Sequence, residues 1–478
     1  LAVAGETGVA NGAVTINDVN AASLLDAGTI TTATLNNYGN STVNSGALST
    51  VNISGTGGTL GLTAGALTTA TSTTLAINAT GATAGAITAD ADYTTVNVAG
   101  STTASTIANL TATGATTLNV SGDAKVTFTA QTLAAVTDIN VTNTGGASFG
   151  TAIGNSVAFD AAGGADAVAV GATNKAIVMG AGDDTVTVNA SALGVSATLG
   201  NGSIDAGTGT DTLVMTGANA ATASAAVTFG NTISGFEALK LTGTSQDTAT
   251  AVNLGNLDSI NTVTIDGDRD YTLSGITPGM ALTLQGVTTS ATDTVLSLTA
   301  ASGTTDSVSV TLANSSAGAL DFGTLTAAAV ETLNITTSDT GTVAAGNQYA
   351  TIDILDVTAA DATSIVVSGN NGLNMATNTA AKVTSFDASG VAGNNTTEDI
   401  AANLAVTYAS GNTTAGANLT LKGGAGNDTL TGNKNADTIT GNAGNDTLAG
   451  STGADTIDGG TGTDTYAIAP TGTGKTAA

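Results

Sequence analysis

Residues 423–467 read GGAGNDTLT, GNKNADTIT, GNAGNDTLA, GSTGADTID and GGTGTDTYA, five nonapeptides laid end to end without a gap. Each unit approaches the pattern G-G-x-G-x-D-x-U-x, in which six residues form a turn and three form a short strand whose U side chain points inward. A flexible Gly/Asn linker would not keep this register, so the pattern predicts a regular coil. The sixth-place aspartates are Asp428, Asp437, Asp446, Asp455 and Asp464, and the U residues are Leu430, Ile439, Leu448, Ile457 and Tyr466.

Two nonapeptides make one coil of a parallel β-roll, so residues eighteen apart lie on the same edge, roughly 4.8 Å apart. This spacing predicts that Asp428, Asp446 and Asp464 line one edge, and that Asp437 and Asp455 line the other. Carboxylates that close repel each other by roughly 3 to 4 kcal/mol per pair at an effective dielectric constant near 20. A cation between the coils is therefore expected.

Calcium suits this geometry because it takes oxygen ligands at about 2.3 to 2.6 Å, including the backbone carbonyls that a glycine-rich turn exposes. The repeat therefore predicts several calcium ions. The residues expected to hold them are the five aspartates with the turn residues Gly424, Gly426, Asn427, Gly444, Asn445, Gly453 and Gly462.

The amino-acid composition predicts a narrow core that is built from small side chains. The chain has 478 residues, of which 63 are glycine and only 3% are aromatic, and such a chain fits a stack of thin coils. Its formal net charge of -28 disfavours nucleic acid as a partner. Cysteine and histidine do not occur, which removes thiol and histidine-base chemistry. The sequence contains no run of eighteen apolar residues, so no transmembrane segment is predicted.

Short apolar-polar-apolar triplets recur upstream of the nonapeptides at intervals of 21 to 24 residues. Their alternation predicts half-buried strands, and the period is that of one coil of a parallel β-solenoid. An antiparallel sandwich is the alternative, but hairpin signals are scarce. We also expect the stacked triplet centres Asn52, Asn97, Asn119 and Asn140 to form an outward amide ladder, interrupted at Ala76.

A degenerate copy of the nonapeptide lies in mid-chain. AAGGADAVA and MGAGDDTVT place Asp166 and Asp184 eighteen residues apart, with the turn glycines Gly164 and Gly182. Lys175 stands where the intervening unit would have aspartate, so only one edge can bind an ion. AGTGTDTLV adds Asp211 with Gly209, three units after Asp184, which predicts the opposite edge if the nine-residue register holds.

The predicted fold class is therefore all-β, a long parallel β-solenoid with embedded nonapeptide β-rolls. Short helices are expected only at residues 13–27 and 217–227. The predicted segments are a solenoid at 1–160, a degenerate calcium-binding segment at 161–217, a solenoid at 218–422, the β-roll at 423–467 and a tail at 468–478.

Three carboxylates surround the only arginine at Asp266, Asp268, Arg269 and Asp270. The spacing is wrong for an EF-hand. A polar turn closed by Arg–carboxylate pairs is the simplest interpretation, and a lone ion site or a lyase-like site are the alternatives. No other pattern suggests catalysis, so we expect a protein that is not an enzyme.

Several longer sequence segments resemble those of a known protein family. KAIVMGAGDDTVTV (175–188), SGFEALKLTG (234–243), SGNNGLNM (368–375), VTSFDASG (383–390) and the nonapeptides resemble the calcium-dependent surface-layer proteins of Caulobacter, which belong to the RTX class. The resemblance extends over essentially the whole chain. The nonapeptides alone are shared with RTX toxins, proteases, lipases and adhesins.

The resemblance implies a structural protein that is exported by type I secretion and assembles with copies of itself into a hexagonal lattice on the bacterial cell surface. It implies that a separate N-terminal domain, which this chain lacks, anchors the lattice to lipopolysaccharide. The start of the chain and its ending TGTGKTAA are then those of a fragment. An RTX adhesin stalk and, more remotely, a β-helix polysaccharide lyase are the alternatives.

Overall fold

The chain folds into two compact units, each of which is described by itself. Unit 1 comprises residues 1–215 and 226–237, and unit 2 comprises residues 216–225 and 238–478. The computed structural model describes residues 2–4, 12–18, 28–64, 70–188, 200–243, 250–267, 270–285, 293–298, 305–316, 318–340, 352–393, 401–468 and 476–477.

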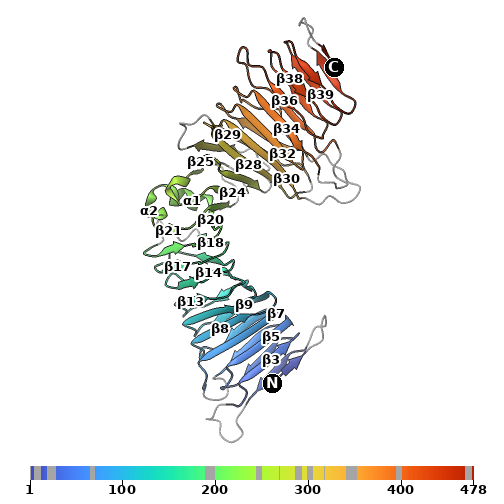
Figure 1. Cartoon of the computed structure of the whole chain (residues 1–478). Coiled ribbons are helices and arrows are strands. Elements are labelled where there is room, and N and C mark those ends of the chain that lie inside the picture. Colours follow the sequence, from blue (N-terminus) through green and yellow to red (C-terminus); the bar gives the residue numbers. More distant parts are fainter. Residues whose placement is uncertain are drawn as a thin grey trace. The chain divides into compact units, whose positions relative to one another are not determined.

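Unit 1 is a stack of coils in which two ladders of strands run side by side (Figure 1). Every pairing that joins its strands is parallel. One ladder is β1 (Ala2–Ala4), β3 (Thr32–Asn36), β5 (Thr50–Gly57), β7 (Thr74–Ala89), β8 (Thr95–Gly100), β10 (Thr117–Gly122), β13 (Asp138–Val141), β15 (Ala158–Ala161), β17 (Ala176–Val178), β19 (Ser203–Asp205) and β21 (Ile233–Ser234). The other is β2 (Val14–Asn17), β4 (Ser41–Asn44), β6 (Leu60–Thr63), β7 again, β9 (Ser105–Ala112), β11 (Val126–Phe128) with β12 (Gln131–Thr132), β14 (Ala147–Ile153), β16 (Ala167–Val170), β18 (Thr185–Val188) and β20 (Thr212–Thr216).

Unit 2 repeats this plan, again with parallel pairings. Its first ladder is β22 (Ala238–Thr242), β24 (Thr262–Asp266), β26 (Ala281–Gln285), β28 (Ser307–Asn314), β30 (Thr332–Asp339), β32 (Ser364–Gly369), β34 (Ser385–Val391), β36 (Thr420–Lys422), β38 (Thr438–Thr440), β40 (Thr456–Asp458) and β42 (Thr476–Ala477). Its second is β23 (Thr250–Asn253), β25 (Tyr271–Ile276), β27 (Asp293–Leu298), β29 (Asp321–Ala328), β31 (Asp353–Thr358), β33 (Leu373–Met375), β35 (Val406–Ala409), β37 (Thr429–Thr431), β39 (Thr447–Ser451) and β41 (Thr465–Ile468).

This parallel pairing confirms the β-solenoid and rules out the antiparallel sandwich. Most coils have two strands, although β7 is one long strand that belongs to both ladders; the triplet pattern predicted only one strand per coil. The second strand of a coil is often rich in alanine, threonine and serine, as in β9 (STIANLTA) and β14 (ASFGTAI). This composition weakens the alternation of apolar and polar residues by which a strand is predicted.

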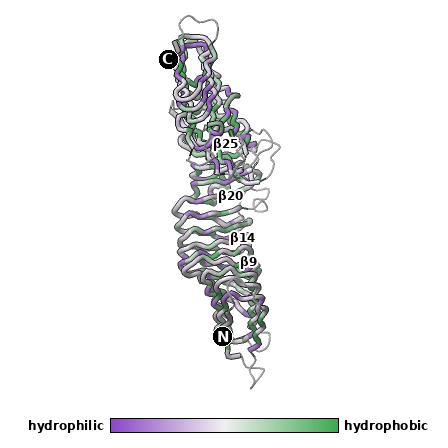
Figure 2. The backbone as a smooth tube through the Cα atoms, turned by 90° about the vertical axis from the view of Figure 1, so that its right-hand side faces the viewer, coloured by the Kyte–Doolittle hydropathy of each residue, from purple (hydrophilic) through white to green (hydrophobic). Residues whose placement is uncertain are grey.

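Strand residues alternate between the inside and the outside of each coil, and hydrophobic and hydrophilic residues are interspersed along the coils in Figure 2. In β8 and β10 the burial pattern alternates buried and half-buried residues without a break over the apolar part of the strand. Inward residues of successive coils stack in columns, such as Val96, Leu118 and Ile139, each no more than 1% exposed. Small side chains fill the rest at close-packed density.

The outward face of the first ladder carries amide side chains that bond between coils. Asn119 Nδ2 donates to Asn97 Oδ1 at 2.7 Å, and Asn140 Nδ2 donates to Asn119 Oδ1 at 2.9 Å. The predicted row through Asn52 is wrong in one respect. Asn52 pairs with Asn78, not Ala76, and Asn78 Nδ2 donates to Asn52 Oδ1 at 2.8 Å. Two short ladders, offset by two residues along β7, replace one interrupted ladder.

The helices agree with one of two predictions. α1 (Gly217–Ser224) lies within the predicted segment 217–227, and the Thr216 hydroxyl caps its start by accepting a hydrogen bond from Asn219 N. A shorter helix, α2 (Val227–Gly230), follows it. Another short element, η2 (Leu254–Asn256), is a single 3₁₀ turn. The helix predicted at 13–27 is wrong over Val14–Asn17, which form β2 and pair with β4. The β-branched alternation of VTIN favours a strand. Residues 19–27 lie outside the described residues.

Candidate metal centre

The aspartates of the terminal nonapeptides stack on two edges, as their spacing predicts. On one edge, Asp428 N donates to Asp446 Oδ1 at 2.8 Å, and Asp446 N donates to Asp464 Oδ1 at 3.0 Å. On the other, Asp437 N donates to Asp455 Oδ1 at 3.1 Å. Each bond spans one coil of eighteen residues. Strands β37, β38 and β39 therefore each begin beside a carboxylate that belongs to the next coil.

These carboxylates are buried. Asp428, Asp437 and Asp446 are each 1% exposed, and Asp455 is 4% exposed. The apolar residues two places later hold them there, since Leu430, Ile439 and Leu448 are fully buried in the core. The outermost coil is more open, because Asp464 and Tyr466 are only half-buried.

The first-place glycines form a cradle around the second carboxylate oxygen. A Cβ added at Gly423, Gly441 or Gly459 would lie 2.1 Å from Oδ2 of the aspartate five residues later in the same unit. At Gly432 and Gly450 the corresponding distance is 2.3 Å. The sequence prediction chose second- and fourth-place glycines and missed these, because a consensus pattern does not show which glycine faces the carboxylate.

The fourth-place glycines bring the turns of successive coils into contact. A Cβ at Gly444 would lie 1.9 Å from Gly426 O, and one at Gly462 would lie 1.8 Å from Gly444 O. Gly444 and Gly462 also have φ values of 127° and 138°, which side chains with a Cβ resist. Glycine at these predicted positions therefore stacks the turn carbonyls beside the aspartate row.

The second turn departs from this plan at its fourth place. Asn435 replaces glycine there, and its Nδ2 donates to Thr414 O and Ala417 O, both at 3.0 Å. Asn433 Nδ2 also donates to Ala417 O at 2.9 Å. Side-chain amides therefore occupy turn carbonyls at this corner of the roll.

The buried oxygens fit a cation. Asp446 Oδ2 is inaccessible to solvent and has no hydrogen-bond partner, although a buried charged group without one is costly. Among the described residues, no group of three or more acidic, histidine or cysteine side chains converges to bind a metal unaided. An ion in the rows would take backbone carbonyls or water as well as carboxylates, which calcium does readily.

The electrostatics agree. Burial raises the pKa of Asp428 to about 7, against the N–H groups of Val406 and Gly424, and the charge of Asp446 raises it further. Burial also raises the pKa of Asp446, with Asp464 adding to the effect. A bound divalent cation would favour the charged forms.

Residues 420–448 and 440–467 match the RTX calcium-binding nonapeptide repeat. These coils are RTX calcium-binding repeats. They bind calcium ions, as the nonapeptide spacing predicted. Proteins with RTX repeats are typically secreted. No curated protein matches the chain.

A second row of acidic residues lies in mid-chain, outside the matched RTX repeats. Asp166 N donates to Asp184 Oδ1 at 2.7 Å, and Asp184 N donates to Asp211 Oδ1 at 2.8 Å. The three aspartates are at most 1% exposed, and Oδ2 of each has no hydrogen-bond partner. Burial raises the pKa of Asp166 to about 7 and that of Asp184 to about 6, and a neighbouring aspartate adds to each shift.

The prediction that Asp211 lies on the opposite edge from Asp184 is wrong. Thr185 pairs with Thr212, so the two aspartates occupy the same edge of adjacent coils. One coil here is 27 residues long, because the extra nine residues fall between β18 and β19 instead of adding half a coil. The turn glycines Gly164, Gly182 and Gly209 all have positive φ, as RTX turn glycines do.

The other candidate sites gain less support. Lys175 is exposed on the opposite edge, where it replaces an aspartate. Asp266 pairs with Lys240 across neighbouring strands, with Nζ and Oδ2 3.0 Å apart. Asp268 and Arg269 lie outside the described residues.

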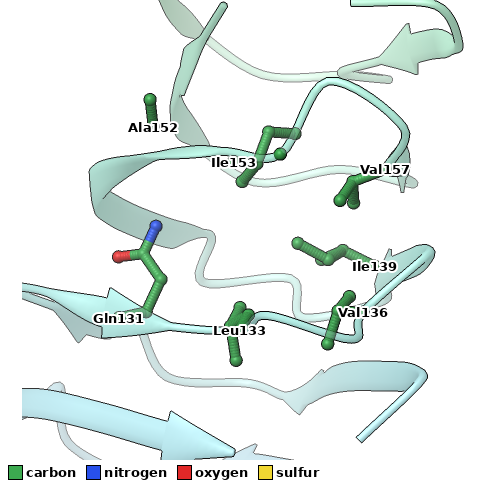
Figure 3. A pocket seen from close by; sticks show the side chains of 8 residues that line it. Gln131, Leu133, Val136, Ile139, Ala152, Ile153 and Val157 are labelled. Atoms are coloured by element: carbon green, nitrogen blue, oxygen red, sulfur yellow. The ribbon is translucent and has the colours of Figure 1, made fainter. Parts of the chain in front are cut away.

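One hollow between coils of unit 1 has a volume of about 50 Å³ (Figure 3). Leu133, Val136 and Ile139 line it together with Ile153 and Val157, and it has no titratable lining residue. In the described part of the chain, no helix is long and apolar enough to span a membrane.

Proposed function

We propose that this chain is the structural part of a secreted cell-surface protein, in which calcium orders the coils and copies of the chain assemble into a two-dimensional lattice. The main support for this proposal is that the calcium-binding RTX repeats are continuous with the long solenoid that precedes them in the chain. β36 and β37 pair with the upstream strands β34 and β35 in the same parallel ladders. Calcium that orders the roll therefore also orders the end of the stack.

The charge distribution supports a second role for calcium between copies. The net charge of -28 makes two such chains repel each other. Exposed carboxylates such as Asp123, Asp138 and Asp160 lie on the outer surface of unit 1. Divalent cations that bridge exposed carboxylates would convert this repulsion into attraction. The resemblance to surface-layer proteins supports the same assembly, with lipopolysaccharide as the anchor of an N-terminal domain.

An RTX adhesin stalk is the competing function, because a calcium-ordered solenoid also makes a stiff spacer. Electron microscopy of the secreted, full-length protein separates the two. With millimolar calcium the lattice proposal predicts periodic sheets that dissolve in excess chelator. Separate rods without periodic sheets, at protein concentrations where folding is complete, would contradict it and favour the stalk.

A further inference from the structure

The mid-chain acidic row does not end at Asp211. Asp211 N donates to Glu237 Oε2 at 3.0 Å, just as each earlier aspartate N–H donates to the carboxylate one coil later. Glu237 does not belong to a nonapeptide, and sequence analysis did not select it. The row therefore has four carboxylates, at Asp166, Asp184, Asp211 and Glu237.

The backbone before Glu237 keeps one glycine of the RTX-type turn, although this turn is two residues shorter. A Cβ at Gly207 would lie 1.9 Å from Gly180 O, and one at Gly235 would lie 2.7 Å from Gly207 N, so these three glycines stack in one column. All three have positive φ, between 81° and 93°. Phe236 is fully buried and Leu239 is 1% exposed, which fixes Glu237 at the start of its strand.

Asp211, whose backbone N–H donates to Glu237, also carries an unsatisfied buried oxygen. Asp211 is completely buried, its Oδ1 accepts from Asp184 N, and its Oδ2 has no hydrogen-bond partner. Two adjacent carboxylates with an unpartnered oxygen are the ligands that a hard divalent cation prefers.

The two ends of the row differ in their positive charge. Near Asp166, Lys125 Nζ donates to Ala165 O at 3.2 Å, and the Lys125 charge favours the ionised form of Asp166. Among the described residues, no lysine forms an ion pair with Asp211 or Glu237 at the other end. The ion pairs of the described residues join Lys240 to Asp266, Lys382 to Asp361 and Lys422 to Asp387.

We propose that Asp211 and Glu237 hold a divalent cation of the calcium class, and that Glu237 is the terminal ligand of the mid-chain row. This inference rests on the proposal that calcium orders the coils, and it adds a site where no nonapeptide exists. The sequence signal is an acid two residues before a buried apolar residue. Asp211-Thr212-Leu213 and Glu237-Ala238-Leu239 share this spacing with the D-x-U part of the repeat.

Counting bound calcium on the full chain tests the proposal. Glu237→Gln keeps an oxygen acceptor for Asp211 N but removes the charge, so equilibrium dialysis against calcium should show one ion fewer than the wild type. Asp183→Asn and Asp205→Asn are matched controls, because both residues are exposed and their charges also reach Asp211. Both controls should bind the wild-type number of ions. Glu237→Asp, which restores the charge on a shorter side chain, should recover the ion with weaker affinity.

An unchanged ion count in Glu237→Gln would overturn the proposal, and so would an equal loss in either control. Asp184→Asn separates this failure from a failure of the wider account. If Asp184→Asn loses calcium while Glu237→Gln does not, the row binds calcium and only the Glu237 site is wrong. Hydrogen exchange of β16 and β18 shows whether Glu237→Gln still folds; loss of their protection in saturating calcium would give Glu237 a structural role and contradict the ligand assignment.

Discussion

The coils of β8, β10 and β13 and the coils of the RTX roll stack by the same parallel pairing, but they satisfy their polar side chains differently. In the first region each asparagine amide bonds to the next, so the outward row is neutral and complete within the protein. In the roll, buried aspartates accept backbone N–H groups. Oδ2 of Asp428 and of Asp437 accepts a further N–H group within its own turn, whereas Asp446 Oδ2 has no partner. We therefore expect the amide coils to fold without an ion and the acidic coils to need one.

Removing calcium should break this comparison most visibly. In excess chelator, amides of residues 423–467 should exchange hydrogen as an unfolded chain does, because the stacked carboxylates then repel without compensation. The strands β8, β10 and β13 should keep their protection. Hydrogen exchange with mass spectrometry measures both regions in one sample, and a fully protected roll in chelator would refute the folding role of calcium.

Asp446→Asn should weaken calcium binding by the roll about tenfold or more, equivalent to about 1.4 kcal/mol or more. Asp446 lies between Asp428 and Asp464, so its charge serves two gaps of the same edge. Asparagine keeps the acceptor for Asp428 N. The midpoint of calcium-induced folding, followed by circular dichroism, measures the effect. Asp458→Asn, at an exposed acid of β40, is the control and should leave the midpoint in place.

A third buried carboxylate sharpens the comparison because amides satisfy it. Asp353 is completely buried; its Oδ1 accepts from Asn314 Nδ2 at 2.8 Å and Leu320 N at 2.9 Å, and its Oδ2 accepts from Asn371 Nδ2 at 2.9 Å. Burial nevertheless raises its pKa from 3.8 to about 6. Since the folded pKa is the higher one, the unfolded chain loses its proton first as pH rises. The contribution to stability is thus greatest below pH 4 and is lost between about pH 4 and 6.

The expected loss is on the order of 3 kcal/mol, at about 1.4 kcal/mol per pKa unit. Asp353→Asn has no such titration. The difference in unfolding free energy between wild type and variant, measured by denaturant at saturating calcium, should therefore shift against the wild type by about 2 kcal/mol of this total from pH 4 to pH 6. A difference that does not change with pH would show that Asp353 titrates normally.

The smallest effect is expected in the amide ladder. Asn119→Ala removes two side-chain hydrogen bonds and should cost about 1 to 2 kcal/mol, equally with and without calcium. Asn78→Ala removes one bond, to Asn52, and should cost about half as much. Denaturant unfolding of the two variants measures both costs. A calcium-dependent cost for Asn119→Ala would contradict the separation of the two regions.

Much of this architecture could be predicted from the sequence because its period is strict. The eighteen-residue spacing of Asp428, Asp446 and Asp464 fixed their common edge. The edge predicted for Asp211 was wrong. Nine additional residues between Asp184 and Asp211 can either add half a coil or lengthen one coil, and sequence spacing does not distinguish the two. Glu237 was missed because the turn before it is shorter and its acid is glutamate. The first-place glycines were missed because their role depends on the direction of an aspartate side chain.

The central claim is that calcium ions lie between the stacked carboxylates of the acidic rows. Structure determination of the calcium-loaded chain, with anomalous scattering to identify the metal, tests it most directly. The account predicts ions between Asp428 and Asp446 and between Asp446 and Asp464, with ligand oxygens at about 2.3 to 2.6 Å, and further ions along Asp166, Asp184, Asp211 and Glu237. Aspartate rows without metal at millimolar calcium would contradict it.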